Sequence, residues 1–181
     1  MDRPIRRHLE WLRSVLLIGV AMIFSGCAAP DDLAEAAVEI QVRWAVDSLP
    51  AGTEVTIFEA LHDDVLSSTT SYAAGESVPV GAPIADGVLW TEFDEPARFV
   101  VVLTNSSDQS FTFWVAPHLP LPMEAEPDLV ITCLCMGELY EVPEGGSWRR
   151  VVEYGLSRRS DVREPLSITH VLTRGALPTA E

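Results

Sequence analysis

Two cysteines one residue apart, Cys133 and Cys135, are the residues whose types and spacing could do chemistry. They lie in the segment DLVITCLC, residues 128–135, whose apolar and β-branched residues are typical of a β-strand. On a strand, side chains two residues apart leave the same face about 6.5–7 Å apart, whereas a disulfide needs Cβ atoms about 3.8 Å apart. The spacing therefore argues against a disulfide between them. It favours two thiolates that face the same way, with Leu134 directed into the core.

Two thiolates side by side suit a soft metal ion of low coordination number, and sulfur ligands select Cu(I). Met136 follows the pair and could add a thioether sulfur if the chain bends at Gly137. His118 and Met123 lie in the proline-rich segment that leads to the cysteines, and we expect that they could close over the ion. His170 is expected to be an ordinary strand histidine. A structural zinc site would need four ligands, and the histidines after residue 27 are not paired in sequence.

Dithiol redox catalysis is the rival use of the cysteine pair. A reactive thiol needs its pKa lowered by a cation, a helix N-terminus or a Cys-X-X-Cys geometry. Residues 119–148 contain no Arg, Lys or His, and their six carboxylates would attract a metal cation instead. An arginine brought in by the fold, such as Arg149 or Arg150, could change this. A third interpretation is that both cysteines are small buried apolar side chains.

The N-terminal residues 1–26 have the composition of a secretory signal peptide, because a basic region precedes an apolar run that is too short to span a bilayer. The run ends in Phe24-Ser25-Gly26-Cys27, which resembles the lipobox of bacterial lipoproteins. This resemblance implies cleavage before Cys27 and a lipid on its sulfur. We therefore expect a protein outside the cytoplasm, anchored by lipid to a membrane of the bacterial cell envelope.

The charge of the chain excludes one class of partner. The sequence has no Lys and a formal net charge of −15, so nucleic-acid phosphates and anionic headgroups would repel it. The membrane is then reached through the lipid alone. The sequence also lacks a nucleophile elbow, a P-loop and a dinucleotide-binding glycine motif. We therefore predict a protein that is not an enzyme and does not bind DNA or RNA.

The segments that must position the cysteines read as short strands separated by Gly, Pro, Asp and Asn. In residues 38–46 the apolar side chains alternate with polar ones and share one face, and eight further segments after it have strand composition. This pattern predicts an all-β fold, an immunoglobulin-like or cupredoxin-like β-sandwich. We expect a tether over residues 27–37, one sandwich domain over residues 38–175, and a disordered tail over residues 176–181.

From about Val101 onward the chain resembles the CtaG-type copper chaperones of cytochrome c oxidase assembly. The matching pieces are VLTNSSDQSF, a proline-rich approach, TCLCMGELYEVPEGGSW and RRVVEYGL. The resemblance implies an exported immunoglobulin-like sandwich with Cys133 and Cys135 as Cu(I) ligands. Leu134 and Met136 stand where the family has Phe, and the anchor here is a lipobox instead of a transmembrane helix, which leaves the client open.

These observations together predict a membrane-tethered, extracytoplasmic Cu(I)-binding protein. As a copper chaperone it would hand the metal by ligand exchange to an envelope acceptor such as a cytochrome oxidase, and a homodimer could share the metal. Two alternatives stay open. One is a non-enzymatic lipoprotein interaction or assembly module with packed cysteines, and the other is a dithiol redox protein.

Overall fold

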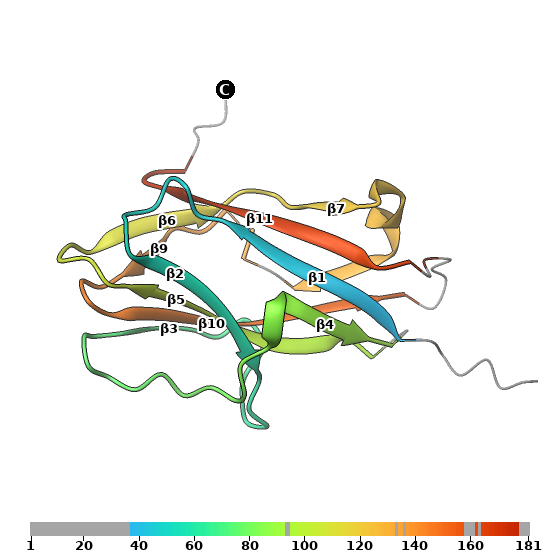
Figure 1. The fold of residues 1–181 in the computed structure, drawn as a ribbon, viewed down its shortest axis with the longest axis horizontal. Helices are drawn as coiled ribbons and strands as arrows, with labels where there is room; N and C mark the ends of the chain where they lie inside the picture. Colours follow the sequence, from blue (N-terminus) through green and yellow to red (C-terminus); the bar gives the residue numbers. More distant parts are fainter. Residues whose placement is uncertain are drawn as a thin grey trace, which may run out of the picture. The chain divides into compact units, whose positions relative to one another are not determined.

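Two β-sheets lie face to face in the computed structural model, which describes residues 37–92, 95–132, 134–135, 137–157, 162 and 164–177 (Figure 1). One sheet has the strand order β4-β1-β11-β6-β9, with β7 also paired to β11; the other has the order β2-β5-β10-β3, with β8 also paired to β10. The predicted all-β sandwich is therefore confirmed. The signal peptide, the lipidated Cys27, nearly all of the tether and the last four residues of the tail lie outside the described residues.

The strand bounds follow the predicted segments closely. The first sheet contains β1 (Val38–Ala45), β4 (Val88–Thr91), β6 (Phe111–Val115), β7 (Leu119–Leu121), β9 (Tyr140–Val142) and β11 (Leu166–Arg174). The second contains β2 (Thr53–Glu59), β3 (Thr69–Tyr72), β5 (Ala97–Asn105), β8 (Leu129–Thr132) and β10 (Ser147–Leu156). Two short 3₁₀ turns, η1 (Ala85–Gly87) and η2 (Met123–Asp128), complete the elements. Within the described ranges, neither turn nor any other helix has the length and apolarity needed to span a bilayer.

The first and last strands of the sandwich are neighbours. β1 and β11 run parallel, in register from the pair Ile40–Leu166 to the pair Ala45–Val171. Alternate residues of β1 are buried as the sequence predicts, and alternate residues of β11 are buried too. The inward positions of β11 are Leu166, Ile168, His170 and Leu172. A histidine therefore occupies a core position among aliphatic side chains.

β5 is buried on both faces, which explains its unbroken apolar run from Phe99 to Leu103. Its odd-numbered side chains belong to the core between the sheets. Val100 and Val102 pack on the outer face in a second cluster with Val151, covered by side chains from the segment between β2 and η1. β5 is thus packed between two clusters of apolar side chains, one on each face.

The strand predicted for residues 128–135 is shorter than expected. β8 pairs with β10 and ends at Thr132, and β9, which belongs to the other sheet, begins at Tyr140. We call residues 133–139, which connect the two sheets, the crossing segment. A segment that crosses between sheets cannot continue the hydrogen-bond ladder of the first. Leu134 enters the core with 1% exposure, as predicted, but Cys135 lies in the crossing segment. The expectation that Cys135 sits on a strand is therefore wrong.

Candidate metal centre

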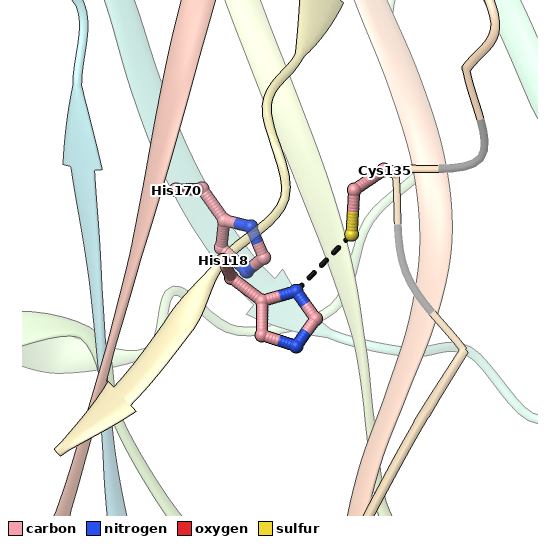
Figure 2. Close-up of side chains that lie close together, drawn as sticks. All are labelled: His118, Cys135 and His170. Atoms are coloured by element: carbon pink, nitrogen blue, oxygen red, sulfur yellow. Dashed lines mark hydrogen bonds between the residues drawn. The ribbon is translucent and has the colours of Figure 1, made fainter. Parts of the chain in front are cut away.

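Three side chains from separate segments converge at the end of the crossing segment. One ligand atom each from His118, Cys135 and His170 lies within 4.8 Å of the other two. Figure 2 shows the two imidazole rings side by side, with the cysteine sulfur directed toward them. Two nitrogens and one sulfur at this separation form a donor set that a single metal ion could join.

His170 is placed by the pairing of the first and last strands. In the β1–β11 register it stands opposite Trp44, and the two rings stack with centroids 4.8 Å apart and planes inclined by 24°. Its side chain is 0% exposed. The backbone register fixes the position of the ring, and the indole fixes the plane of the ring.

His118 is placed by the segment that connects β6 to β7. Both strands pair antiparallel with β11, β6 near its end and β7 near its start. The β7 register sets Leu119 opposite Thr169, so the preceding residue falls beside His170. The rings of His118 and His170 meet edge to face, with centroids 5.3 Å apart. A strand interrupted between residues 115 and 119 thus brings the second imidazole to the first.

Cys135 is placed by the crossing segment, and its Sγ atom lies 3.1 Å from Nδ1 of His118 (Figure 2). Leu134 is anchored in the core on one side of it. On the other side Gly137 has a φ of 71°, a left-handed backbone that suits glycine and allows the chain to turn. The cysteine is half-buried, so the sulfur combines a fixed position with an approach from solvent.

A hydrogen-bond network holds the crossing segment on both sides of Cys135. The hydroxyl of Tyr140 donates to the carboxylate of Glu138 at 2.8 Å and contacts the carbonyl of Leu134 at 3.3 Å. Arg150 donates to the same carboxylate and to the Tyr140 oxygen, both at 3.0 Å. The hydrogen bond from Tyr140, then the one from Arg150, lowers the pKa of Glu138, while burial raises that of Tyr140. The network thus ties the crossing segment to Arg150 on β10.

The far side of His170 contacts the other sheet. The hydroxyl of Tyr154, on β10, is hydrogen-bonded to Nε2 of His170. Nδ1 of His170 is buried and has no hydrogen-bond partner among the described residues. Burial, and then the neighbouring His118, lowers the pKa of His170 to about 3, so the ring is neutral at neutral pH. Burial raises the pKa of Tyr154, which keeps its proton.

The sulfur of Cys135 is in a disulfide in this structure, and the other two cysteines of the chain lie outside the described residues. A disulfide sulfur has no proton to donate, so Nδ1–H of His118 is the donor in the contact with it. Thiolate, not disulfide, is the form that binds metals. The described state is therefore the oxidised form of the site, and metal binding at Cys135 requires reduction.

The site differs in membership from the predicted one. Cys133 and Met136 lie outside the described residues, so their predicted roles stay predictions. The structure brings His118 to Cys135, while Met123 begins η2 and is 56% exposed. The sequence prediction missed His170 as a member of the cluster. The alternating pattern of this strand could have revealed it. His170 falls on the same inward face as Leu166, Ile168 and Leu172.

Comparison with known families adds one match. Residues 38–174 match the family described as Domain of unknown function (DUF8709), which spans β1 to β11. No curated protein and no solved structure matches the chain.

Proposed function

The chain belongs to the DUF8709 family, and from its site we propose that it is a carrier of Cu(I), tethered by lipid outside the cytoplasm. The observation that carries the proposal is the 3.1 Å contact between the cysteine sulfur and the histidine nitrogen of Cys135 and His118, with His170 beside them. Once Cys135 is reduced, its thiolate and the imidazole at this distance would supply two donors to a soft ion.

Copper(I) fits the donors better than the hard divalent ions do. Thiolate ligands favour Cu(I), imidazole accepts copper readily, and Mg²⁺ and Ca²⁺ require oxygen ligands. The acidic chain, with a net charge of −15 and no Lys, favours the approach of cations. A half-buried sulfur at the rim of a sandwich supports transfer, because an acceptor ligand can reach the metal before the carrier releases it.

Cys133 and Met136 complete the proposed ligand set from the sequence. They flank Cys135 closely in the sequence, which makes both sulfurs candidates to join the ion. In this proposal Cys133 is the second thiolate and Met136 an auxiliary thioether. The site then offers more donor atoms than the two or three that Cu(I) needs. One ligand can therefore leave the ion while another takes its place during transfer.

The tether and the acceptor are also part of the proposal. The lipobox-like sequence at Cys27 would hold the sandwich at the membrane surface, and the tether before β1 would connect the lipid to the domain. The acceptor is an envelope protein, and the resemblance to oxidase copper chaperones favours a cytochrome oxidase. A homodimer that shares the metal is compatible with a half-buried site. The chain acts in this role without catalysing a reaction.

Anaerobic titration of the reduced protein with Cu(I), against a chromogenic Cu(I) chelator, tests the proposal. The double variant Cys133→Ser, Cys135→Ser should lose competition with the chelator. Cys27→Ser, in the same chain produced without its lipid, is the matched control. It removes a thiol that is not among the proposed copper ligands. Equal Cu(I) affinity in the wild type and the double variant would refute the proposal.

A dithiol redox protein is the second candidate, because Cys135 is in a disulfide. It predicts a thiol whose pKa is well below that of ordinary cysteine, lowered by the neighbouring His118 when that ring is protonated. The pH dependence of alkylation of the reduced protein separates the two functions. A carrier needs no such shift, whereas a redox catalyst does.

A further inference from the structure

We infer that His170 is an internal ligand of the metal centre and that Tyr154 is its positioning residue. This inference rests on the proposed function and deepens it. The centre would then bind metal through two imidazole nitrogens and the sulfur of Cys135, a donor set that accepts a divalent ion as well as Cu(I). A site built on thiolates alone would favour the monovalent ion.

One ring nitrogen of His170 is unpaired among the described residues. His170 is 0% exposed, and its Nδ1 atom has no hydrogen-bond partner within the described part of the chain. A buried polar atom without a partner is destabilising. In a histidine that only filled the core, nothing would offset the destabilisation from its unpaired nitrogen. A metal ion held between His170, His118 and Cys135 would satisfy the nitrogen.

The opposite ring nitrogen of His170 is hydrogen-bonded. Histidines that bind metals nearly always hold their other ring nitrogen with a second group, which fixes the tautomer and the orientation of the ring. The Tyr154 hydroxyl occupies this place at Nε2. When Nε2–H donates to the tyrosine oxygen, the lone pair lies on Nδ1, the atom without a partner. A hydroxyl can donate or accept, so the contact with Tyr154 allows this tautomer, and we infer that it is the one that binds the metal.

The imidazole of His170 is positioned before any metal binds. The ring of His170 is fixed by its strand register, by the stacked ring of Trp44 and by Tyr154 on the opposite sheet. His118 stands at its edge, 5.3 Å away between ring centroids. Two imidazoles that are both held before the metal arrives lose little freedom when they bind it. Two imidazole nitrogens and one cysteine sulfur are also the main donors of the two-histidine, one-cysteine sites that bind copper in electron-transfer proteins.

Co(II) is the probe for this inference, because a cysteine-bound Co(II) ion absorbs visible and near-ultraviolet light. The reduced protein, produced without its lipid, is titrated with Co(II) and, separately, with Cu(I), both without oxygen. The variants are His170→Gln and Tyr154→Phe, and His62→Gln is the control because this histidine is exposed and distant in sequence from the cluster.

The inference predicts different losses for the two variants. Loss of an outer-shell partner alone lowers metal affinity by about 10- to 100-fold, and we expect this for Co(II) binding to Tyr154→Phe, with shifted absorption bands. His170→Gln, which loses the ligand itself, should exceed that range. His62→Gln should bind as the wild type does. The inference is overturned if His170→Gln binds Co(II) as tightly as His62→Gln.

Failure of the inference and failure of the proposed function give different results. If Cys135→Ser abolishes Cu(I) binding while His170→Gln leaves both metals unaffected, the carrier function stands and the internal ligand is wrong. If no variant changes the affinity for either metal, the proposed function is wrong. X-ray absorption of the wild-type Co(II) complex covers the case in which His170→Gln does not fold. Two imidazoles with one or more sulfurs support the inference, and one imidazole or none overturns it.

Discussion

Trp44 on the first strand and His170 on the last strand stack with their ring centroids 4.8 Å apart. The contact follows from the parallel pairing of β1 and β11, which sets these two residues opposite each other. Trp44 also lines an open groove between β1 and β2. The fluorescence of the Trp44 indole should therefore respond to metal binding at the proposed centre.

Tryptophan emission should report metal binding. Copper bound by the ring that stacks on Trp44 should quench the emission of that indole, so adding Cu(I) to the reduced protein should lower the total emission. In Trp44→Phe most of this change should disappear. Trp90→Phe is the matched control, because Trp90 is 62% exposed on β4. Quenching that is the same in both variants would place the metal elsewhere.

Acid should destabilise the metal-free protein through His170. Its pKa is lowered to about 3 in the folded state by burial and by His118, whereas an unfolded histidine titrates near about 6.5. Between these values the unfolded chain binds a proton that the folded chain does not, so stability is lost as the pH falls. One proton adds a slope of about 1.4 kcal/mol per pH unit to the free energy of unfolding.

Urea unfolding at several pH values from 7.5 to 4 measures this slope. The carboxylates of the chain also contribute, so the comparison is between the wild type and His170→Gln, which lacks the titrating ring. The wild type should lose stability more steeply below pH 6.5 than the variant. Parallel curves for the two proteins would show that His170 is protonated as easily when folded as when unfolded.

The fold could be predicted from the sequence because each strand has a recognisable local sequence pattern. The segments ARFVVVLTN and SWRRVVEYGL coincide with β5 and β10, since β-branched runs bounded by turn residues have few other solutions. The end of β8 could not be predicted in the same way. The composition of residues 128–135 favours a strand throughout, but β9 belongs to the opposite sheet, and that requirement ends the ladder at Thr132.

The site could be predicted only in part, because its members meet through pairings between distant strands. Cys135 was a candidate by residue type, and His118 lies 17 residues before it. What joins them to His170 is the pairing of β7 and β1 with β11, which no local pattern specifies. The phase of His170 on its strand was visible. Its neighbours, Trp44 and Tyr154, come from other strands and could be identified only in the folded chain.

The network that holds the crossing segment should be sensitive to one hydroxyl. In Tyr140→Phe the hydrogen bond to Glu138 is lost, and the buried guanidinium of Arg150 loses one acceptor. Leaving a buried polar group short of a partner costs about 1–3 kcal/mol. We expect a loss of stability in this range, measured by urea unfolding, and faster alkylation of Cys135 in the reduced protein. Tyr72→Phe, on β3, is the control. Unchanged alkylation would mean that the network does not restrain the cysteine.

The redox state of Cys135 should decide whether the protein binds copper. A disulfide sulfur lacks the negative charge of a thiolate and is a poor metal ligand, and Cys135 is in a disulfide in this structure. We expect the oxidised protein to leave a desalting column without Cu(I). After reduction by a phosphine, and removal of the phosphine, the protein should retain the ion. Two protons and two electrons are added to the disulfide in that step, and they generate the thiols on which binding depends.

Reoxidation tests the same dependence in reverse. A mild disulfide oxidant added to the copper-loaded protein should release the ion, because closing the disulfide removes the thiolate that holds it beside His118. Mass spectrometry of the alkylated protein gives the fraction oxidised, and that fraction should follow the fraction of copper released. Copper retained by a fully oxidised chain would show that the two histidines hold the ion without the sulfur. The carrier would then depend on imidazole, and reduction would have no role in loading it.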